Sequence, residues 1–438
     1  MRKYMSLLLS LLLGSLLCSS VLASISDEMD HRRWSGSDQS PSSVLALEQT
    51  ADGHLWLGTQ DSLYRFDGFE FEKFDPANGE QLGAVSSLLS STDGLWVGLR
   101  AGGVRLIKAN GVIQPIDPGL PGGVVFSLAE DQRGQVWAAT NGGLARHDGT
   151  NWHSVGKEEG FNEPHAQAVH VDKDGYVWAA SEEQLYMLSP GVSSFTQIST
   201  NSQSISKITS SSAGDIWITD RAKDHLLHLK KNAYDNIEVE ETPSSRSISI
   251  VLDQQGGAWL GTLGYGVHHI AAGARSRSIE EQGVINSFTV RDGLSSNNVM
   301  ATFIDRDGTL WVGTDSGLDR LTRKTMTPFA LPGGPGGHAL AVDGTGSLWI
   351  GSDNGQLGNI RENSPAIFEL DMPITTLINS QEYGLLVGGH RGIFSLEDDE
   401  LRHIAALPVE SARESAVRAI AVGKNGDIWV SINRAGLF

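Results

Sequence analysis

The chain has 438 residues, of which 39% are hydrophobic and 19% are charged, so it can bury a core in one or more globular units. Its net charge of −19 argues against a nucleic-acid partner and against docking on an anionic membrane surface. The 51 glycines indicate many tight turns.

The N-terminal segment, residues 1–23, has the features of a secretory signal peptide. Two basic residues precede an apolar run, residues 7–17, and Ala23 ends a small-residue cleavage site. We therefore expect export to the periplasm, and no later apolar run reaches membrane-spanning length. Cys18 is the single cysteine of the chain, so the mature protein is expected to be without disulfides.

One tryptophan position recurs along the rest of the chain. Its copies are 37 to 52 residues apart and define ten units, with Leu386 in place of the tryptophan in the ninth. A glycine precedes this position by three residues in eight units, and by two residues in units two and nine, which lie seven units apart. The nine tryptophans are Trp56, Trp96, Trp137, Trp178, Trp217, Trp259, Trp311, Trp349 and Trp429.

Each unit is typical of four short strands. In "DRDGTLWVGTDSGLDRL", residues 305–321, Asp307 and Gly308 are expected to form a tight hairpin, because glycine adopts positive φ without a Cβ clash. Both faces of the next strand are apolar, and Trp311 is expected to pack over Gly313 of its own sheet. Sheets covered on both faces and stacked radially make a β-propeller, so the pattern predicts an all-β fold.

Ten units exceed the blades of one ordinary propeller, and we divide them into seven and three. Residues 24–330 are predicted to form a seven-bladed β-propeller, and residues 331–438 the first three blades of a second, incomplete propeller. The Pro/Gly-rich "LPGGPGG", residues 331–337, suits a linker. The segment around Trp34 is expected to supply the outer strand of the seventh blade, which would bury Trp34. Because the last unit stops as its third strand begins, we expect a truncated piece of a longer protein.

The segment "GLSSNNVMATFIDRDGTLWVGTDSGLDRL", residues 293–321, resembles the two-component regulator propeller repeat. Residues 43–75 are similar to the first blade of such proteins, and the resemblance covers roughly residues 30–438. It implies the exported sensor region of a receptor whose output, beyond a transmembrane helix, is a histidine kinase or a diguanylate cyclase. We find neither output signature here, so we expect no enzymatic activity from this chain. The resemblance leaves open whether the full-length parent is a receptor dimer.

The turn between the second and third strands of each blade opens where ligands commonly bind to propellers. The residue four positions after the repeat tryptophan begins this turn, and six of the seven such residues in the first propeller are polar. We interpret them as a ring of hydrogen-bonding groups, with Tyr265 as a stacking surface, although turns are polar for structural reasons as well. The candidate ligand-binding residues are Gln60, Arg100, Asn141, Glu182, Arg221, Tyr265 and Asp315, and the seventh ring position is Leu263.

No metal site or cofactor is expected from the sequence. The runs "DKDG" (172–175) and "DRDG" (305–308) lack the further ligands of a calcium loop, so their aspartates are expected to serve the hairpins. The histidines of residues 225–228 and 268–269 are expected on the surface. The basic segment 221–231 is interpreted as a solvated edge strand.

These observations favour a sensor that binds a small ligand, such as a glycan or a peptide, and passes the signal to an output domain. Two alternatives stay open. One is an exported propeller enzyme such as a polysaccharide or lactone lyase, which would need an acid and a base with shifted pKa values on one face. The other is a protein-interaction scaffold.

Overall fold

The computed structural model describes residues 29–36, 40–76, 79–232, 236–272, 285–324, 336–360, 366–397, 400–407 and 416–438. The expected signal peptide and most of the expected linker lie outside these residues. The fold is all-β: within the described ranges the one helix is a 3-10 turn, Lys157–Glu159, and no helix is long and apolar enough to cross a membrane. The chain divides into unit 1, residues 1–325, and unit 2, residues 326–438.

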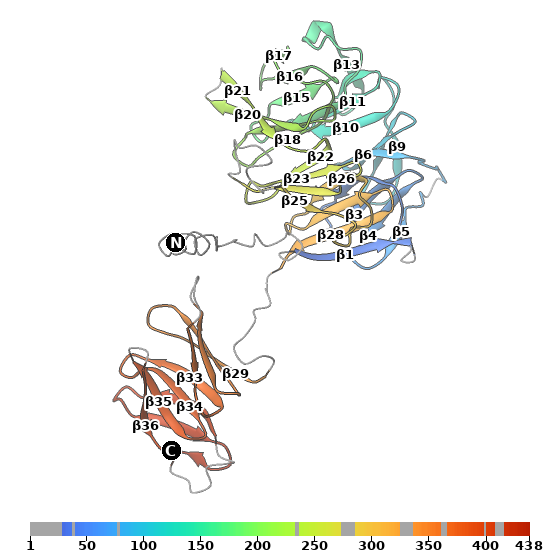
Figure 1. Ribbon diagram of the computed structural model, residues 1–438. Coiled ribbons are helices and arrows are strands. Elements are labelled where there is room, and N and C mark those ends of the chain that lie inside the picture. Colours follow the sequence, from blue (N-terminus) through green and yellow to red (C-terminus); the bar gives the residue numbers. More distant parts are fainter. Residues whose placement is uncertain are drawn as a thin grey trace, which may run out of the picture. The chain divides into compact units, whose positions relative to one another are not determined.

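Unit 1 contains seven four-stranded antiparallel sheets in its described residues (Figure 1). The first three are formed by β2 (Val44–Gln49), β3 (Leu55–Thr59), β4 (Leu63–Phe66) and β5 (Phe71–Lys73); by β6 (Val85–Ser91), β7 (Gly94–Leu99), β8 (Val104–Ile107) and β9 (Ile113–Pro115); and by β10 (Val125–Glu130), β11 (Val136–Thr140), β12 (Gly143–His147) and β13 (Trp152–Val155).

The next three sheets are formed by β14 (Ala168–Val171), β15 (Val177–Ala180), β16 (Leu185–Leu188) and β17 (Thr196–Ile198); by β18 (Ile205–Ser210), β19 (Ile216–Asp220), β20 (His225–Asn232) and β21 (Asn236–Pro243); and by β22 (Ser247–Leu252), β23 (Ala258–Thr262), β24 (Val267–Ile270) and β25 (Ile285–Phe288). The seventh consists of β26 (Val299–Ile304), β27 (Leu310–Thr314), β28 (Gly317–Arg323) and β1 (Met29–Ser35).

The first strand of each sheet is its inner strand. Each inner strand contacts the inner strand of the following sheet, from β2 through β6, β10, β14, β18 and β22 to β26, and β26 contacts β2 again. The seven inner strands therefore form a closed circuit around the centre of unit 1.

Unit 2 contains two four-stranded sheets and one three-stranded sheet in its described residues (Figure 1). They are formed by β29 (His338–Val342), β30 (Leu348–Ser352), β31 (Gln356–Ile360) and β32 (Ala366–Glu369); by β33 (Ile374–Ser380), β34 (Gly384–Gly389), β35 (Gly392–Glu397) and β36 (Glu400–Ala405); and by β37 (Val417–Val422), β38 (Ile428–Ile432) and β39 (Gly436–Leu437).

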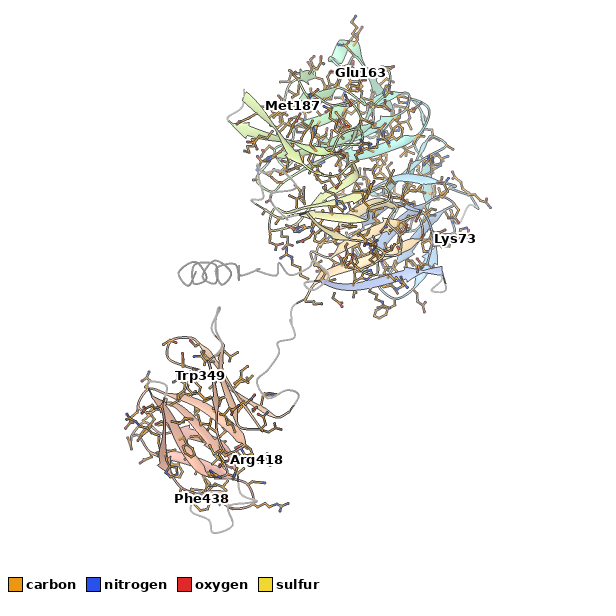
Figure 2. The ribbon with its side chains drawn as sticks, in the orientation of Figure 1. Lys73, Glu163, Met187, Trp349, Arg418 and Phe438 are labelled. Carbon is orange, nitrogen blue, oxygen red and sulfur yellow. The ribbon has the colours of Figure 1, made fainter. Side chains whose placement is uncertain are left out.

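The repeat tryptophans are buried between sheets, with one exception. Eight of them are at most 7% exposed, including Trp349 of unit 2 (Figure 2), whereas Trp429 is 51% exposed. In five units the indole N–H donates to an aspartate six residues earlier, over 2.8 to 3.3 Å. These pairs are Trp137–Asp131, Trp178–Asp172, Trp259–Asp253, Trp311–Asp305 and Trp349–Asp343.

The same aspartates shape the hairpins. Asp305 accepts the backbone N–H groups of Asp307 and Thr309 at 3.0 and 2.9 Å, and Gly308 in this turn has φ of 80°. Asp172 accepts two backbone N–H groups in the same way. The structural role expected for the aspartates of "DKDG" and "DRDG" is thus confirmed.

We expect Asp305→Ala to lower the free energy of unfolding of unit 1 by about 2 kcal/mol, because it leaves the Trp311 indole and two backbone donors without their acceptor. Asp307→Ala is the control, because Asp307 is exposed in the same turn. Urea denaturation of the two variants tests this, and equal midpoints would contradict it.

The glycine two residues after the tryptophan has a different role from the one predicted. Gly313 is approached by Val44 of the first sheet, and a Cβ added at Gly313 would lie 2.7 Å from the Val44 Cγ1. Gly58 faces Val85 of the second sheet in the same manner. The glycine therefore makes room for the next sheet, and the prediction that it receives the tryptophan of its own sheet is wrong, since the neighbouring inner strand fills the space.

The N-terminal strand completes the seventh sheet, which confirms the prediction for Trp34. β1 pairs along its whole length with β28, and Trp34 is 4% exposed and stacks on Trp311 with ring centroids 5.9 Å apart. Asp319 of β28 accepts from the Ser295 backbone at 3.0 Å and contacts the Nε2 atom of His31 on β1 at 2.8 Å. The two ends of unit 1 are thus joined by strand pairing, aromatic packing and a buried carboxylate.

Two sequence expectations for histidines and basic residues are wrong. His228 and His269 are buried, because each lies directly across from a repeat tryptophan on the adjacent strand and packs on its ring, with centroids 4.1 and 4.2 Å apart. His268 is also only 9% exposed. Most of the basic segment, residues 225–231, lies on β20, which is an interior strand of its sheet and not an edge, because the acidic strand β21 pairs with it.

Candidate functional site

The predicted ring residues lie where the second strand of a sheet ends and its inner strand begins. We call this end of unit 1 the entry face. The backbone N–H groups of Arg100, Asn141 and Arg221 donate to Ala84, Val124 and Ser204, over 2.9 to 3.0 Å. These three carbonyls directly precede the inner strands β6, β10 and β18. The entry face therefore holds the turns that the sequence singled out.

The ring side chains are available to solvent. Gln60, Arg100, Asn141, Glu182 and Arg221 are exposed at the end of their strands, and Asp315 is half-buried. Leu263, the apolar ring position, is 51% exposed. Each side chain lies on a different sheet, so the structure distributes these groups around the circuit and does not gather them at one point.

Asp315 is held as a carboxylate by its neighbours. The Asn298 Nδ2 donates to Asp315 at 2.7 Å and the Ser316 hydroxyl at 3.0 Å. Burial acts to raise the pKa of Asp315, but hydrogen bonds from Ser296, Asn298 and Ser316 outweigh it and lower this pKa. Asp315 is therefore a fixed negative acceptor at the entry face.

Tyr265 lines a hollow of about 520 Å³ beside the sixth sheet. Tyr265 is 68% exposed and lies in the turn between β23 and β24, beside the segment that leads into β26. The hollow is lined by Gly264, Tyr265, His268, Ser287, Thr289, Val290, Arg291, Asp292 and Asn297. Of the predicted ligand residues, only Tyr265 lines it.

His268 supports the floor of this hollow. Its Nδ1 lies 2.6 Å from the Ser245 hydroxyl and its Nε2 lies 3.1 Å from the Tyr265 carbonyl. Burial lowers the pKa of His268, so the ring is neutral at pH 7. Asn297 shapes the adjacent wall, because its carbonyl accepts from Gly264 and Gly266 at 3.0 Å each.

Sequence reasoning missed Arg291, Asp292 and Asn297. They belong to the lead-in "RDGLSSNN", whose residues carry the family resemblance. Their position directly before an inner strand is the signal that places them on the entry face. The described residues contain no group of three or more His, Cys, Asp or Glu side chains that could hold a metal ion.

Comparison with known protein families identifies the repeat. The model of the two component regulator propeller family matches residues 38–61, 119–142 and 293–316. The chain carries two-component regulator propeller repeats. Each matched segment of this propeller family includes an inner strand or the turn that begins on the entry face. None of the curated proteins searched matches the chain.

Solved structures share the fold. The chain is similar to the extracellular domain of the hybrid two component system BT3049 from B. thetaiotaomicron, with 19% identity and a TM-score of 0.57 over 93% of this chain and 58% of that one. The extracellular domain of BT4673 from the same organism gives 15% identity, a TM-score of 0.55, and coverage of 94% and 58%. The chain thus spans 58% of the length of both domains.

A second kind of protein shares the fold as well. Virginiamycin B lyase from Staphylococcus aureus gives 13% identity and a TM-score of 0.55, covering 68% of this chain and 100% of the lyase. At this identity the likeness concerns the fold and not the chemistry.

Proposed function

We propose that this chain is the ligand-sensing propeller region of an exported, membrane-anchored signal-transduction receptor. The observation that carries the proposal is the family of its repeats, matched in three places, together with similar solved structures that are extracellular domains of hybrid two component systems. The entry face, with its polar ring and the Tyr265 hollow, is the surface on which we place the ligand.

The architecture is part of the same proposal. The seven sheets of unit 1 form one seven-bladed propeller, residues 24–330, and residues 331–438 form the first three blades of a second. In unit 2, Leu340 of β29 is 60% exposed and Trp429 of β38 is 51% exposed. Further blades packed on the first and last sheets of unit 2 would cover these side chains, as neighbouring sheets cover the seven repeat tryptophans of unit 1.

The ligand class that we propose is a short glycan or a peptide. Tyr265 offers an exposed aromatic ring for stacking, and Arg291, Asp292 and Asn297 beside it offer donors and acceptors for hydroxyl or amide groups. A conformational signal from ligand binding at the entry face would be transmitted through the rigid sheets to an output domain.

Thermal unfolding of the chain with a panel of oligosaccharides and short peptides tests the proposal. A ligand at 100 times its Kd stabilises the protein by about 2.7 kcal/mol, which is readily measured as a rise in Tm. We expect at least one compound to bind. The double variant Arg100→Ala with Asn141→Ala, and separately Tyr265→Ala, should weaken that compound about tenfold or more, as expected for the loss of one or two hydrogen bonds or a stacking contact.

Arg133→Ala is the matched control, because Arg133 is an exposed arginine in the hairpin at the other end of the third sheet. Binding that is unchanged in all entry-face variants would remove these residues from the site. Conversion of a panel compound into a product, followed by mass spectrometry, would support the lyase alternative in place of the sensor.

A further inference from the structure

The residue directly across from the repeat tryptophan, on the third strand of the sheet, is basic in five of the seven sheets of unit 1. These residues are Arg65, Arg146, His228, His269 and Arg320. Four of them lie beside a carboxylate. The distances are 2.5 Å from Arg65 to Glu72, 3.2 Å from His228 to Asp215, 3.1 Å from His269 to Asp253 and 3.8 Å from Arg320 to Asp30. Arg146 of β12 is the exception.

The outer strand of the third sheet explains why Arg146 has no acidic partner. In the first sheet Glu72 lies across from Arg65, whereas His153 lies across from Arg146 in the third. His153 in turn contacts Asp148 at 2.7 Å. Among the described residues no carboxylate oxygen lies within 4 Å of a guanidinium nitrogen of Arg146, and its Nε is buried without a hydrogen-bond partner. Arg146 is therefore a half-buried cation with unused donors, which is a costly arrangement.

Arg146 lines a hollow of about 200 Å³ between the third and fourth sheets, at their hairpin end. Its guanidinium carbon lies 5.6 Å from the centroid of the Trp137 ring. This contact occupies one face of the flat group and leaves the N–H groups on its edge for a planar acceptor. The fourth sheet contributes an apolar wall of Leu188, Pro190 and Val192, and Val192 is 55% exposed.

The other charged groups of the hollow leave the charge of Arg146 uncompensated. Asp131 accepts hydrogen bonds from the Trp137 indole at 3.0 Å and from the backbone N–H groups of Arg133 and Gln135 at 2.9 and 3.0 Å, so its carboxylate serves its own hairpin. Arg133 also lines the hollow, and its charge offsets that of Asp131. The hollow is thus locally positive in a chain whose net charge is −19.

We propose that this hollow binds a small carboxylate on a branched hydrocarbon body, either a free acid or the C-terminal residue of a peptide. The carboxylate accepts two parallel hydrogen bonds from the Arg146 guanidinium, which is the geometry that arginine favours. The hydrocarbon body packs on Leu188, Pro190 and Val192. This site is separate from the ligand site proposed on the entry face, because the hairpins lie at the other end of the sheets.

Isothermal titration of the full chain tests the proposal. The probes are 4-methylpentanoate for the free acid, N-acetylleucine for the peptide terminus, 4-methylpentanamide as the neutral counterpart and acetate as the anion without a body. We expect at least one of the two acids to bind about tenfold or more tightly than the amide and than acetate, because the amide loses the charge and acetate loses the apolar contact. The tighter of the two acids identifies the source of the carboxylate.

Arg146→Met is expected to weaken acid binding about tenfold or more, as for the loss of a charge-assisted hydrogen bond. The fourth sheet carries Met187 at the same position, so the variant is expected to fold. Arg65→Met is the matched control, because it removes an arginine from the same position of the first sheet, where Glu72 already pairs with it.

Val192→Asp tests the same hollow without touching a buried side chain. The new carboxylate should repel the acid and weaken its binding about tenfold or more. Val112→Asp is the matched control, because Val112 is an exposed valine in the corresponding turn of the second sheet.

Three results would overturn the proposal. The first is equal binding of an acid and the amide, and the second is unchanged acid binding in Arg146→Met. The third is a lack of binding of both acids to the wild-type chain. Acetate that binds as tightly as the larger acids would also overturn it, in favour of a simple anion site. None of these outcomes depends on whether a glycan or peptide binds at the entry face.

Discussion

Trp34→Ala is expected to lower the free energy of unfolding of unit 1 by about 3 to 5 kcal/mol, the usual cost of removing a buried tryptophan. Trp34 is 4% exposed, stacks on Trp311, and meets Phe66 of the first sheet edge-on with ring centroids 5.1 Å apart. It therefore packs at the one place where the seventh sheet meets the first, and its loss leaves a cavity at the closure of the circuit.

Urea denaturation followed by tryptophan fluorescence measures this effect. Arg33→Ala is the control on the same strand, because Arg33 is exposed and its guanidinium makes only a 3.4 Å hydrogen bond to the Gly293 carbonyl. A loss below about 1 kcal/mol for Trp34→Ala, well under the range for buried aromatic truncations, would show that β1 does not close the circuit in solution.

Glu48→Gln is expected to stabilise the protein above pH 7 and to have little effect below pH 4.5. Burial raises the pKa of Glu48 to about 7. A hydrogen bond from the backbone N–H of Gln49 and the positive charge of Lys207 oppose this rise. The unfolded chain releases the proton near pH 4.5 and the native chain only near pH 7. The native state therefore loses stability between these two pH values, and the loss is complete above pH 7.

The gain from Glu48→Gln above pH 7 is about 3 kcal/mol at most, since each pKa unit corresponds to 1.36 kcal/mol. Denaturation curves of the wild type and the variant at pH 4.5 and pH 8 measure the difference. The control is Glu158→Gln, whose exposed carboxyl should show no such dependence. An equal stability difference at both pH values would show that Glu48 does not carry the shifted pKa.

The repeat predicted the sheets well because its signals are local. The aspartate, glycine and tryptophan of one hairpin lie within seven residues, and in the seventh sheet Asp305 accepts hydrogen bonds from the Trp311 indole at 2.8 Å and from the Gly308 backbone at 3.0 Å. The place of Trp34 was also predictable, because a seventh sheet with three strands of its own needs a fourth from elsewhere in the chain.

The predictions that were wrong concern contacts between paired strands and between neighbouring sheets. His228 is buried because it lies directly across from Trp217 on the adjacent strand. The spacing of His225 and His228 in the sequence does not reveal which residue of β19 each of them faces. Likewise, the space in front of Gly313 is filled by Val44, a residue more than 260 positions away. Such packing follows from the closed circuit and not from any single unit.

The candidate site was predictable only in outline. The ring positions were found because they share one place in the repeat, and Tyr265 because it is an aromatic residue in a polar turn. The hollow around Tyr265 combines the turn after β23, the end of β25 and the lead-in to β26, which are separate in the sequence.

The pairing of β1 with β28 has a consequence for the order of folding. His31 and Asp319 are 288 residues apart, so the closing contacts form only after nearly all of unit 1 has been synthesised. Until then the six earlier sheets can only stack as an open arc with an apolar face at each end. Closure is a long-range step that lowers the folding rate, and the arc is the aggregation-prone species that a chaperone would have to protect.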